Sequence, residues 1–292
     1  MAITVLDGPV GLALVSSALF GVALVLTQFG LKYLAPRQGA LISIPTITVL
    51  LWALAPVLLD STRWNWAAVL IFSAVGLVYP AAVTLLTYEA NRQMGPSIAG
   101  ALGNLGPVFA VAIAAIVFGD LPGPLQALGI AAIVAGVVAV SLARSANGPS
   151  WPLWAIALPL GAAAIRGAIQ PITKIGLALW PNAYVASLSG FTASSLVIAA
   201  MATMPAGGRA AGSRCRGAAW FSCVGLCNGG AVLTLYAALA RGSVTLVAPL
   251  VATYPLVTVI LTRVFLGGTR IEMRTSIGIA LTVSGVALLL GS

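Results

Sequence analysis

Apolar segments long enough to cross a membrane follow one another along almost the whole chain. A transmembrane helix needs about 20 mostly apolar residues, and only 7% of this chain is charged, against about 25% in soluble domains. The segments are 10–34, 39–59, 66–88, 96–118, 122–142, 152–178, 182–204, 216–240, 243–266 and 273–291. The sequence therefore predicts an all-α integral membrane protein with about ten transmembrane helices and no separate soluble domain.

The net charge of +9 comes from basic residues scattered over the ends of these segments. Because they form no basic domain, we expect no nucleic-acid partner. Most of them fall on one side of the predicted topology, so the positive-inside rule makes that side cytoplasmic and places both termini outside. We expect a monomer in the bacterial inner (plasma) membrane, where its partners are the lipid bilayer and a small-molecule substrate.

A nine-residue motif near the end of each half indicates a duplicated unit. GIAAIVAGV at 129–137 returns as GIALTVSGV at 278–286. Pro107 and Pro255 also fall at the same place in the fourth and ninth segments. Short apolar motifs can recur by chance in so simple a composition, but landmarks in the same order favour duplication.

The ends of the first and sixth segments agree as well, with QFGLK at 28–32 and QPITK at 170–174. The two units are then 1–146 and 147–292, with five helices each. An odd number of spans makes the second copy enter the membrane from the opposite side, so the repeats are predicted to be inverted. Inverted repeats place a transport pathway along their interface and can alternate access to it.

The five-plus-five layout, the Gln-x-x-x-Lys helix ends, the fourth helix with its proline and the glycine-rich last helix together resemble the EamA-type family of the drug/metabolite transporter superfamily. The resemblance covers nearly the whole chain and rests on the order of these motifs, since each alone is degenerate. It implies a carrier similar to bacterial exporters of amino acids, including aromatic ones. It also implies a central cavity built by helices one, three, four, six, eight and nine, with the fifth and tenth outside.

Arg166 is the outstanding polar residue, because it lies near the middle of the sixth segment. A charge at the centre of a membrane helix costs about 2.5–3.5 kcal/mol on the insertion scale. Its guanidinium is suited to bind a substrate carboxylate through two parallel hydrogen bonds. Alternatively, the side chain reaches the membrane surface or pairs with backbone carbonyls. The equivalent depth in the first repeat holds Leu24, so this charge breaks the symmetry of the duplication.

Four amides are further candidates to line the cavity. Gln28 and Gln170 occupy matched positions in the two repeats, although hydrogen bonds between packed helices would also account for them. Asn104 and Asn228 lie in glycine-rich helix interiors, where either a ligand or another helix can approach closely.

Tyr79 and Tyr254 each precede a helix-kinking proline. A kink frees backbone carbonyls, and a neighbouring phenol can stack on a guest or hydrogen-bond to it. We therefore expect both tyrosines to line the cavity. Lys32 and Lys174 lie closer to helix ends, where anchoring at the membrane surface is the expected role.

The chain lacks the residues that most chemistry requires. It has no histidine, and its acidic residues fall at helix ends or in connections: Asp7, Asp60, Asp120, Glu272, and Glu89 as a surface pair with Arg92. A proton-coupled carrier usually needs a titratable relay inside the membrane, and an enzyme needs a metal cluster or a nucleophile with its base. The three cysteines are interpreted as packing residues. We expect no enzyme, metal or cofactor.

These observations favour a secondary transporter, acting as a uniporter, that exports small neutral zwitterionic metabolites, above all amino acids. One cation in the cavity suits a carboxylate, whereas a phosphorylated substrate would require more basic groups. The alternatives are a carrier of sugar phosphates, nucleosides or drugs, with or without proton coupling. An intramembrane enzyme ranks last.

Overall fold

The computed structural model describes residues 8–59, 64–103, 105–119, 121–143, 152–202 and 213–266, and residues 277, 278, 280, 281, 284, 285 and 288. Over this part of the chain the structure is helical and contains no strand. The helices are α2 (Pro9–Leu31), α3 (Pro36–Leu58), α4 (Trp66–Val78), α5 (Ala81–Gly103), α6 (Gly106–Phe118), α7 (Pro124–Ala143), η1 (Leu153–Ile156), α8 (Ala157–Leu179), α9 (Ala183–Ala202), α10 (Arg214–Arg241), α11 (Val244–Val251) and α12 (Tyr254–Leu266).

The lengths and compositions of these helices suit a membrane protein. Six are long and apolar enough to cross a bilayer: Pro9–Leu31, Pro36–Leu58, Trp66–Met94, Trp154–Leu179, Ala183–Ala202 and Arg214–Arg241. Three shorter apolar helices accompany them among the described residues, at Gly106–Phe118, Pro124–Gly136 and Val244–Thr258. The predicted tenth span, 273–291, lies mostly outside the described residues, so nine apolar helices stand where ten were expected.

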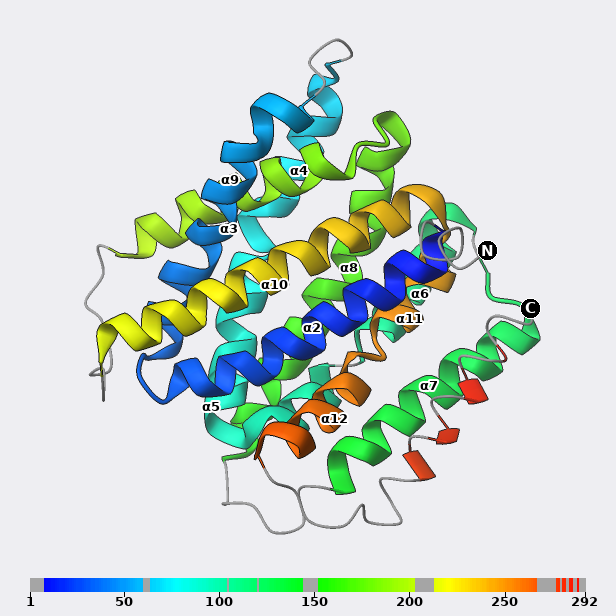
Figure 1. Ribbon diagram of the computed structural model, residues 1–292. Helices are drawn as coiled ribbons and strands as arrows, with labels where there is room; N and C mark the ends of the chain where they lie inside the picture. The colour runs from blue at the N-terminus through cyan, green and yellow to red at the C-terminus, as the bar shows by residue number, and fades with distance from the viewer. Residues whose placement is uncertain are drawn as a thin grey trace.

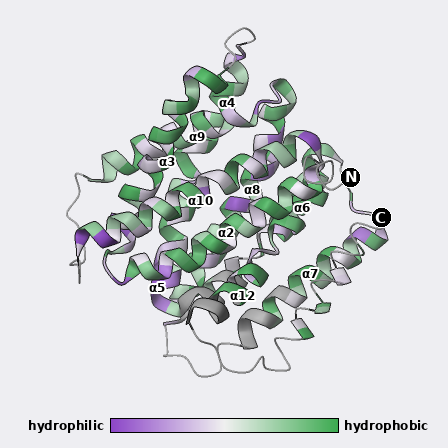
Figure 2. Cartoon of the chain, viewed as in Figure 1, coloured by the Kyte–Doolittle hydropathy of each residue, from purple (hydrophilic) through white to green (hydrophobic). Residues whose placement is uncertain are grey.

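Hydrophobic residues predominate along the helices throughout the bundle (Figure 2), and many of them are exposed on its outside. Val57 and Ile116 are more than 80% exposed, and Leu196 is 68% exposed. A helix surrounded by lipid has no reason to keep a polar outer face, because the solvent on that side is itself apolar. The exposed Val, Ile and Leu residues therefore suit a surface that faces lipid.

The fourth and ninth spans are each broken, which corrects the expectation of continuous helices over 96–118 and 243–266. In the first case α5 ends at Gly103 and α6 begins at Gly106; in the second α11 ends at Val251 and α12 begins at Tyr254. Pro107 and Pro255 take the second position of α6 and α12. Proline has no N–H to donate and its ring clashes with the preceding turn, so a new helix starts there.

The third span, expected over 66–88, is broken at Tyr79–Pro80, between α4 and α5. Ser194 on α9 satisfies polar groups on both sides of this break: its hydroxyl donates to the carbonyl of Gly76 (2.5 Å) and accepts from the N–H of Ala81 (3.1 Å). The helix α5 then continues through 89–95, where a connection was predicted. On this stretch the carboxylate of Glu89 accepts hydrogen bonds from the Nε of Arg92 (3.0 Å) and from the amide of Gln93. Such side-chain pairs one turn apart support a helix.

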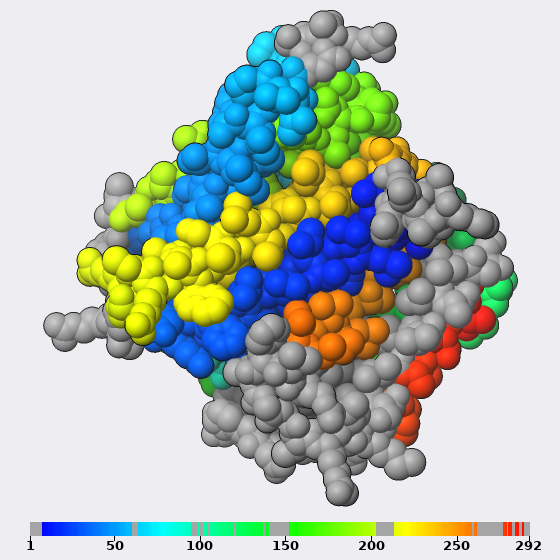
Figure 3. Space-filling model, in the orientation of Figure 1, coloured from blue at the N-terminus to red at the C-terminus, as the bar shows by residue number. Residues whose placement is uncertain are grey.

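Helices from the two halves of the chain pack against each other along most of their lengths. Figures 1 and 3 show α2 and α10 running side by side on one face, with α12 next to α2. Ser16 donates a hydrogen bond to the carbonyl of Ala231 across the α2–α10 contact (2.7 Å). At one end of this contact the ring of Phe221 fills the space that a Cβ atom would need at Gly30 and Gly39.

The repeated glycine motif serves helix packing. A Cβ atom at Gly285, in the second copy, would lie 2.7 Å from the carbonyl oxygen of Gly129 and 2.8 Å from the N of Ile133, in the first copy. The two copies therefore touch each other. Figure 1 shows the described C-terminal residues beside α7 at the edge of the bundle, so the glycines of the motif belong to the scaffold.

Candidate functional site

A cavity lies between the two halves of the chain, with about 850 Å³ of empty space including its open edge. Its walls come from α2, α3, α5, α8, α9, α10 and α12 and the Tyr79–Pro80 break. The lining residues with polar side chains are Thr27, Ser43, Tyr79, Thr84, Thr87, Tyr88, Arg166, Asn228 and Tyr254. Among the described residues the fifth helix, α7, supplies no lining residue, as expected, but α3 and α9 contribute in addition to the helices that the resemblance implied.

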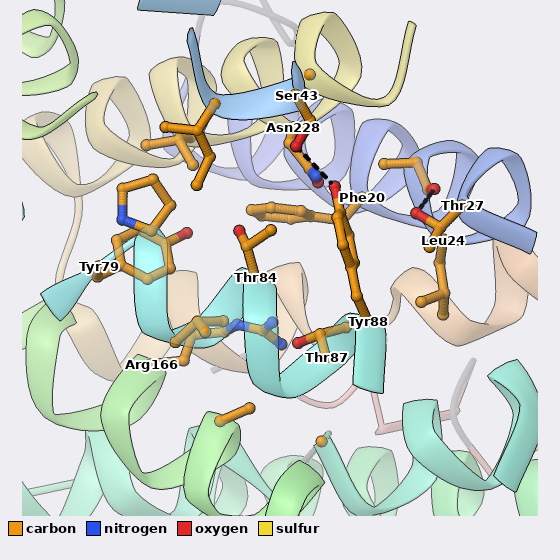
Figure 4. A pocket seen from close by; sticks show the side chains of 18 of the residues that line it. Phe20, Leu24, Thr27, Ser43, Tyr79, Thr84, Thr87, Tyr88, Arg166 and Asn228 are labelled. Atoms are coloured by element: carbon orange, nitrogen blue, oxygen red, sulfur yellow. Dashed lines mark hydrogen bonds between the residues drawn. The ribbon is translucent and has the colours of Figure 1, made fainter. Parts of the chain in front are cut away.

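Arg166 extends from α8 into this cavity (Figure 4). Its Nε is buried and has no hydrogen-bond partner, and its Nη1 makes only a long contact of 3.5 Å with the hydroxyl of Tyr254. The guanidinium carbon lies 5.9 Å from the ring centre of Phe20 and 5.8 Å from that of Tyr254. Among the described residues no acidic side chain lines the cavity, so none of them neutralises this cation there.

The break between α5 and α6 and the break between α11 and α12 both lie close to Arg166 and Tyr254. Tyr254 begins α12, and a Cβ atom at Gly103, the last residue of α5, would lie 3.4 Å from the Tyr254 hydroxyl. On α8, Gly167 follows Arg166 directly, and a Cβ atom there would lie 2.6 Å from the carbonyl oxygen of Gly106. The absence of a side chain at Gly167 therefore lets the start of α6 pack directly against the helix that carries Arg166.

A second polar group lies on the wall formed by α3 and α10. The hydroxyl of Tyr88 donates to the Oγ of Ser43 (3.0 Å), and the Asn228 amide lies beside them (Figure 4). Tyr88 is 2% exposed, and its ring packs on Phe221 with 5.4 Å between ring centres. Thr27, on α2, completes this part of the lining.

The structure places four of the seven predicted site residues in the cavity lining: Arg166, Tyr79, Asn228 and Tyr254. Gln28 is not among the lining residues, and its amide instead donates to the Oδ1 of Asn91 (2.8 Å). Gln170 is likewise outside it, 4% exposed and packed in the interior, where its Oε1 has no partner. Asn104 lies outside the described residues.

The lysines that end the two QxxxK motifs also differ from each other. Lys32 is exposed, with its Nζ 5.2 Å from the ring centre of Phe29, as an anchor at the membrane surface would be. Lys174 instead donates to the carbonyls of Leu239 (2.6 Å) and Gly242 (2.8 Å) at the end of α10. Cations stabilise helix C-termini, so Lys174 fixes α8 to α10, which corrects the predicted anchoring role.

Several lining residues were missed from the sequence. Phe20, Leu24 and Thr27 follow one another at helical spacing on one face of α2, and Thr84, Thr87 and Tyr88 do so on α5. The regular placing of hydroxyls on α5 was an available signal, since residues three and four apart share a helix face. Leu24 was paired with Arg166 by the repeat, and both line the cavity.

A helical membrane bundle in which broken helices meet at a cavity between two halves is the architecture of secondary transporters. The model of the EamA-like transporter family matches this chain twice, over 9–142 and 153–291. The chain therefore belongs to the EamA-like transporter family and is a multi-pass membrane transporter of the drug/metabolite transporter superfamily.

A solved crystal structure shares this fold. It superposes with a TM-score of 0.73 at 20% sequence identity, and the match covers 96% of this chain and 95% of the other. No curated protein matches the chain in sequence.

Proposed function

We propose that this transporter exports neutral amino acids, including hydrophobic and aromatic ones, across the bacterial inner membrane by alternating access. The observation that carries the proposal is the unneutralised guanidinium of Arg166 in the cavity. A cation inside the membrane-spanning bundle without an anionic partner is costly, and a substrate carboxylate would supply that partner. The planar guanidinium matches a carboxylate with two parallel hydrogen bonds.

The helix breaks favour a zwitterion over a simple anion. At each break one helix ends, at Gly103 or Val251, and another begins, at Gly106 or Tyr254. Half-helix N-termini favour anionic groups, and the carbonyls at half-helix C-termini favour cationic ones. An amino acid carries both groups on one carbon: its α-carboxylate is complementary to a helix N-terminus, and its α-ammonium group is complementary to the carbonyls at a helix C-terminus.

The number of basic groups argues against phosphorylated substrates. Arg166 is the single Lys or Arg among the described residues that line the cavity. A phosphate group carries more charge and more acceptor oxygens than a carboxylate, and its sites usually combine several basic side chains or helix ends. Sugar phosphates therefore rank behind amino acids as substrates.

We further propose that transport is uniport, and a flux measurement tests it. Purified protein in liposomes is expected to accelerate the movement of neutral amino acids equally with and without an imposed pH gradient. The reason is that no Asp, Glu or His lines the cavity in the described part of the chain, and the sequence contains no histidine. The Glu89→Gln variant, which changes a carboxylate paired with Arg92, should give the same flux. Accumulation against a concentration gradient, driven by pH, would refute uniport.

A further inference from the structure

The cavity has two polar ends of different chemistry. Arg166, from α8, provides charge, whereas the Tyr88–Ser43–Asn228 group, from α5, α3 and α10, provides hydroxyl and amide groups. In Figure 4 the guanidinium lies on the lower side of the cavity, and Ser43 and Asn228 lie on the upper side, toward which the hydroxyl of Tyr88 points. Most of the remaining lining residues are apolar, among them Ala23, Leu24, Ile44, Ile47 and Val232.

The packing of the protein holds this polar group in place. Gly225 touches the backbone of Ser43 so closely that a Cβ atom at position 225 would overlap the Ser43 carbonyl oxygen. Asn228 lies three residues further along α10, on the same face as Gly225. The Tyr88 ring is held by Phe221 and its hydroxyl by Ser43. Hydrogen-bonding groups fixed in this way are preorganised for a ligand.

Building on the proposed function, we infer that Tyr88, Ser43 and Asn228 form a side-chain subsite that favours, among the neutral amino acids, those ending in a hydroxyl or an amide. Arg166 binds the carboxylate at one end, and the subsite receives the polar end of the substrate side chain. The Tyr88 hydroxyl already donates to Ser43, and a purely hydrocarbon side chain placed there covers the Asn228 amide without offering it a hydrogen bond. Buried polar groups left unpaired lower affinity strongly, so such a site discriminates against the apolar analogue.

Three near-isosteric pairs of amino acids test the inference: threonine and valine, asparagine and leucine, tyrosine and phenylalanine. Their dissociation constants for the full-length protein follow from the concentration dependence of thermal stabilisation. In at least one pair the polar member should bind about tenfold more tightly or better. The Asn228→Leu and Tyr88→Phe variants should each bring that ratio close to one without weakening the apolar member. The control Ser222→Ala removes an α10 hydroxyl that faces Thr46 outside the cavity and should keep the ratio.

The outcomes separate this inference from the proposed function. If both members of every pair bind equally well, or if the ratio survives in both variants, the subsite is refuted; Arg166-dependent binding would then still support amino-acid transport. If none of the six amino acids binds the unmodified protein, both the subsite and the proposed function are wrong. Each variant is compared with its own unfolding temperature without ligand, so a change in stability cannot imitate a change in selectivity.

Discussion

Replacing Arg166 with alanine is expected to reduce the transport of neutral amino acids by about tenfold to a hundredfold. The variant loses a charge-assisted pair with the substrate carboxylate, which ordinary cavity contacts do not replace. It should still fold, because Arg166 forms no ion pair among the described residues and its bond to Tyr254 is long. Arg166 is only partly buried, and its removal loses the long bond to Tyr254 and the ring contacts with Phe20 and Tyr254 but breaks no ion pair among the described residues.

Two variants show whether the effect of Arg166→Ala comes from charge, geometry or general damage. Arg166→Lys keeps the charge but loses the planar fork, so its transport should lie between the unmodified protein and the alanine variant. Arg216→Ala removes an exposed cation outside the cavity and should leave transport unchanged. If Arg166→Ala unfolds, Arg166 is a structural residue; if the variant folds and transports at the normal rate, Arg166 does not bind the substrate carboxylate.

The second large effect is expected from Gly225→Ala, which adds one methyl group where α10 meets α3. The new Cβ would overlap the carbonyl oxygen of Ser43 and lie 3.0 Å from its Cα. Backbone atoms cannot rotate away as a side chain can, so the two helices must separate. We expect a loss of about 3 kcal/mol or more in stability, together with loss of transport, because Ser43 moves away from the Tyr88 hydroxyl.

Gly230→Ala is the matched control on the same helix. The nearest atom to a Cβ there is Cδ1 of Leu19, at 3.2 Å, and a leucine side chain can shift by a few tenths of an ångström. Thermal unfolding and transport of this variant should stay close to those of the unmodified protein. If Gly225→Ala is as stable and active as Gly230→Ala, the α3–α10 contact is looser than the structure shows.

The sequence predicted the class of fold and part of the cavity because both depend on strong local signals. Long apolar segments indicate membrane spans. Arg166 was evident because a charge in the middle of an apolar membrane helix is costly and usually faces a cavity or the interior of the bundle. Tyr79 and Tyr254 were evident because prolines follow them. A kink was predicted at Pro255 but a complete break was not, and the break before Pro107 was missed, since hydropathy stays high across a broken helix and only the backbone changes direction.

The remaining lining residues could not be identified because lipid and cavity both accept apolar side chains. Phe20 and Leu24 resemble the lipid-facing residues around them in type, and only the packing of α2 against α10 decides which face turns inward. Conversely, polar residues do not always line the cavity. The matched positions of Gln28 and Gln170 predicted that both would line it, yet Gln28 forms a hydrogen bond with Asn91 and Gln170 is packed in the interior. Polar groups inside a membrane protein find partners in other helices as readily as in a pathway.

The most direct test compares the best-binding neutral amino acid with its carboxamide, which keeps the ammonium group and side chain but lacks the carboxylate. Their dissociation constants for the full-length protein and for Arg166→Ala can be measured by ligand-dependent thermal unfolding. We expect the amide to bind the unmodified protein about tenfold more weakly or worse, and both compounds to bind the variant equally weakly. Equal binding of amino acid and amide to the unmodified protein would contradict the role of Arg166 as the carboxylate site.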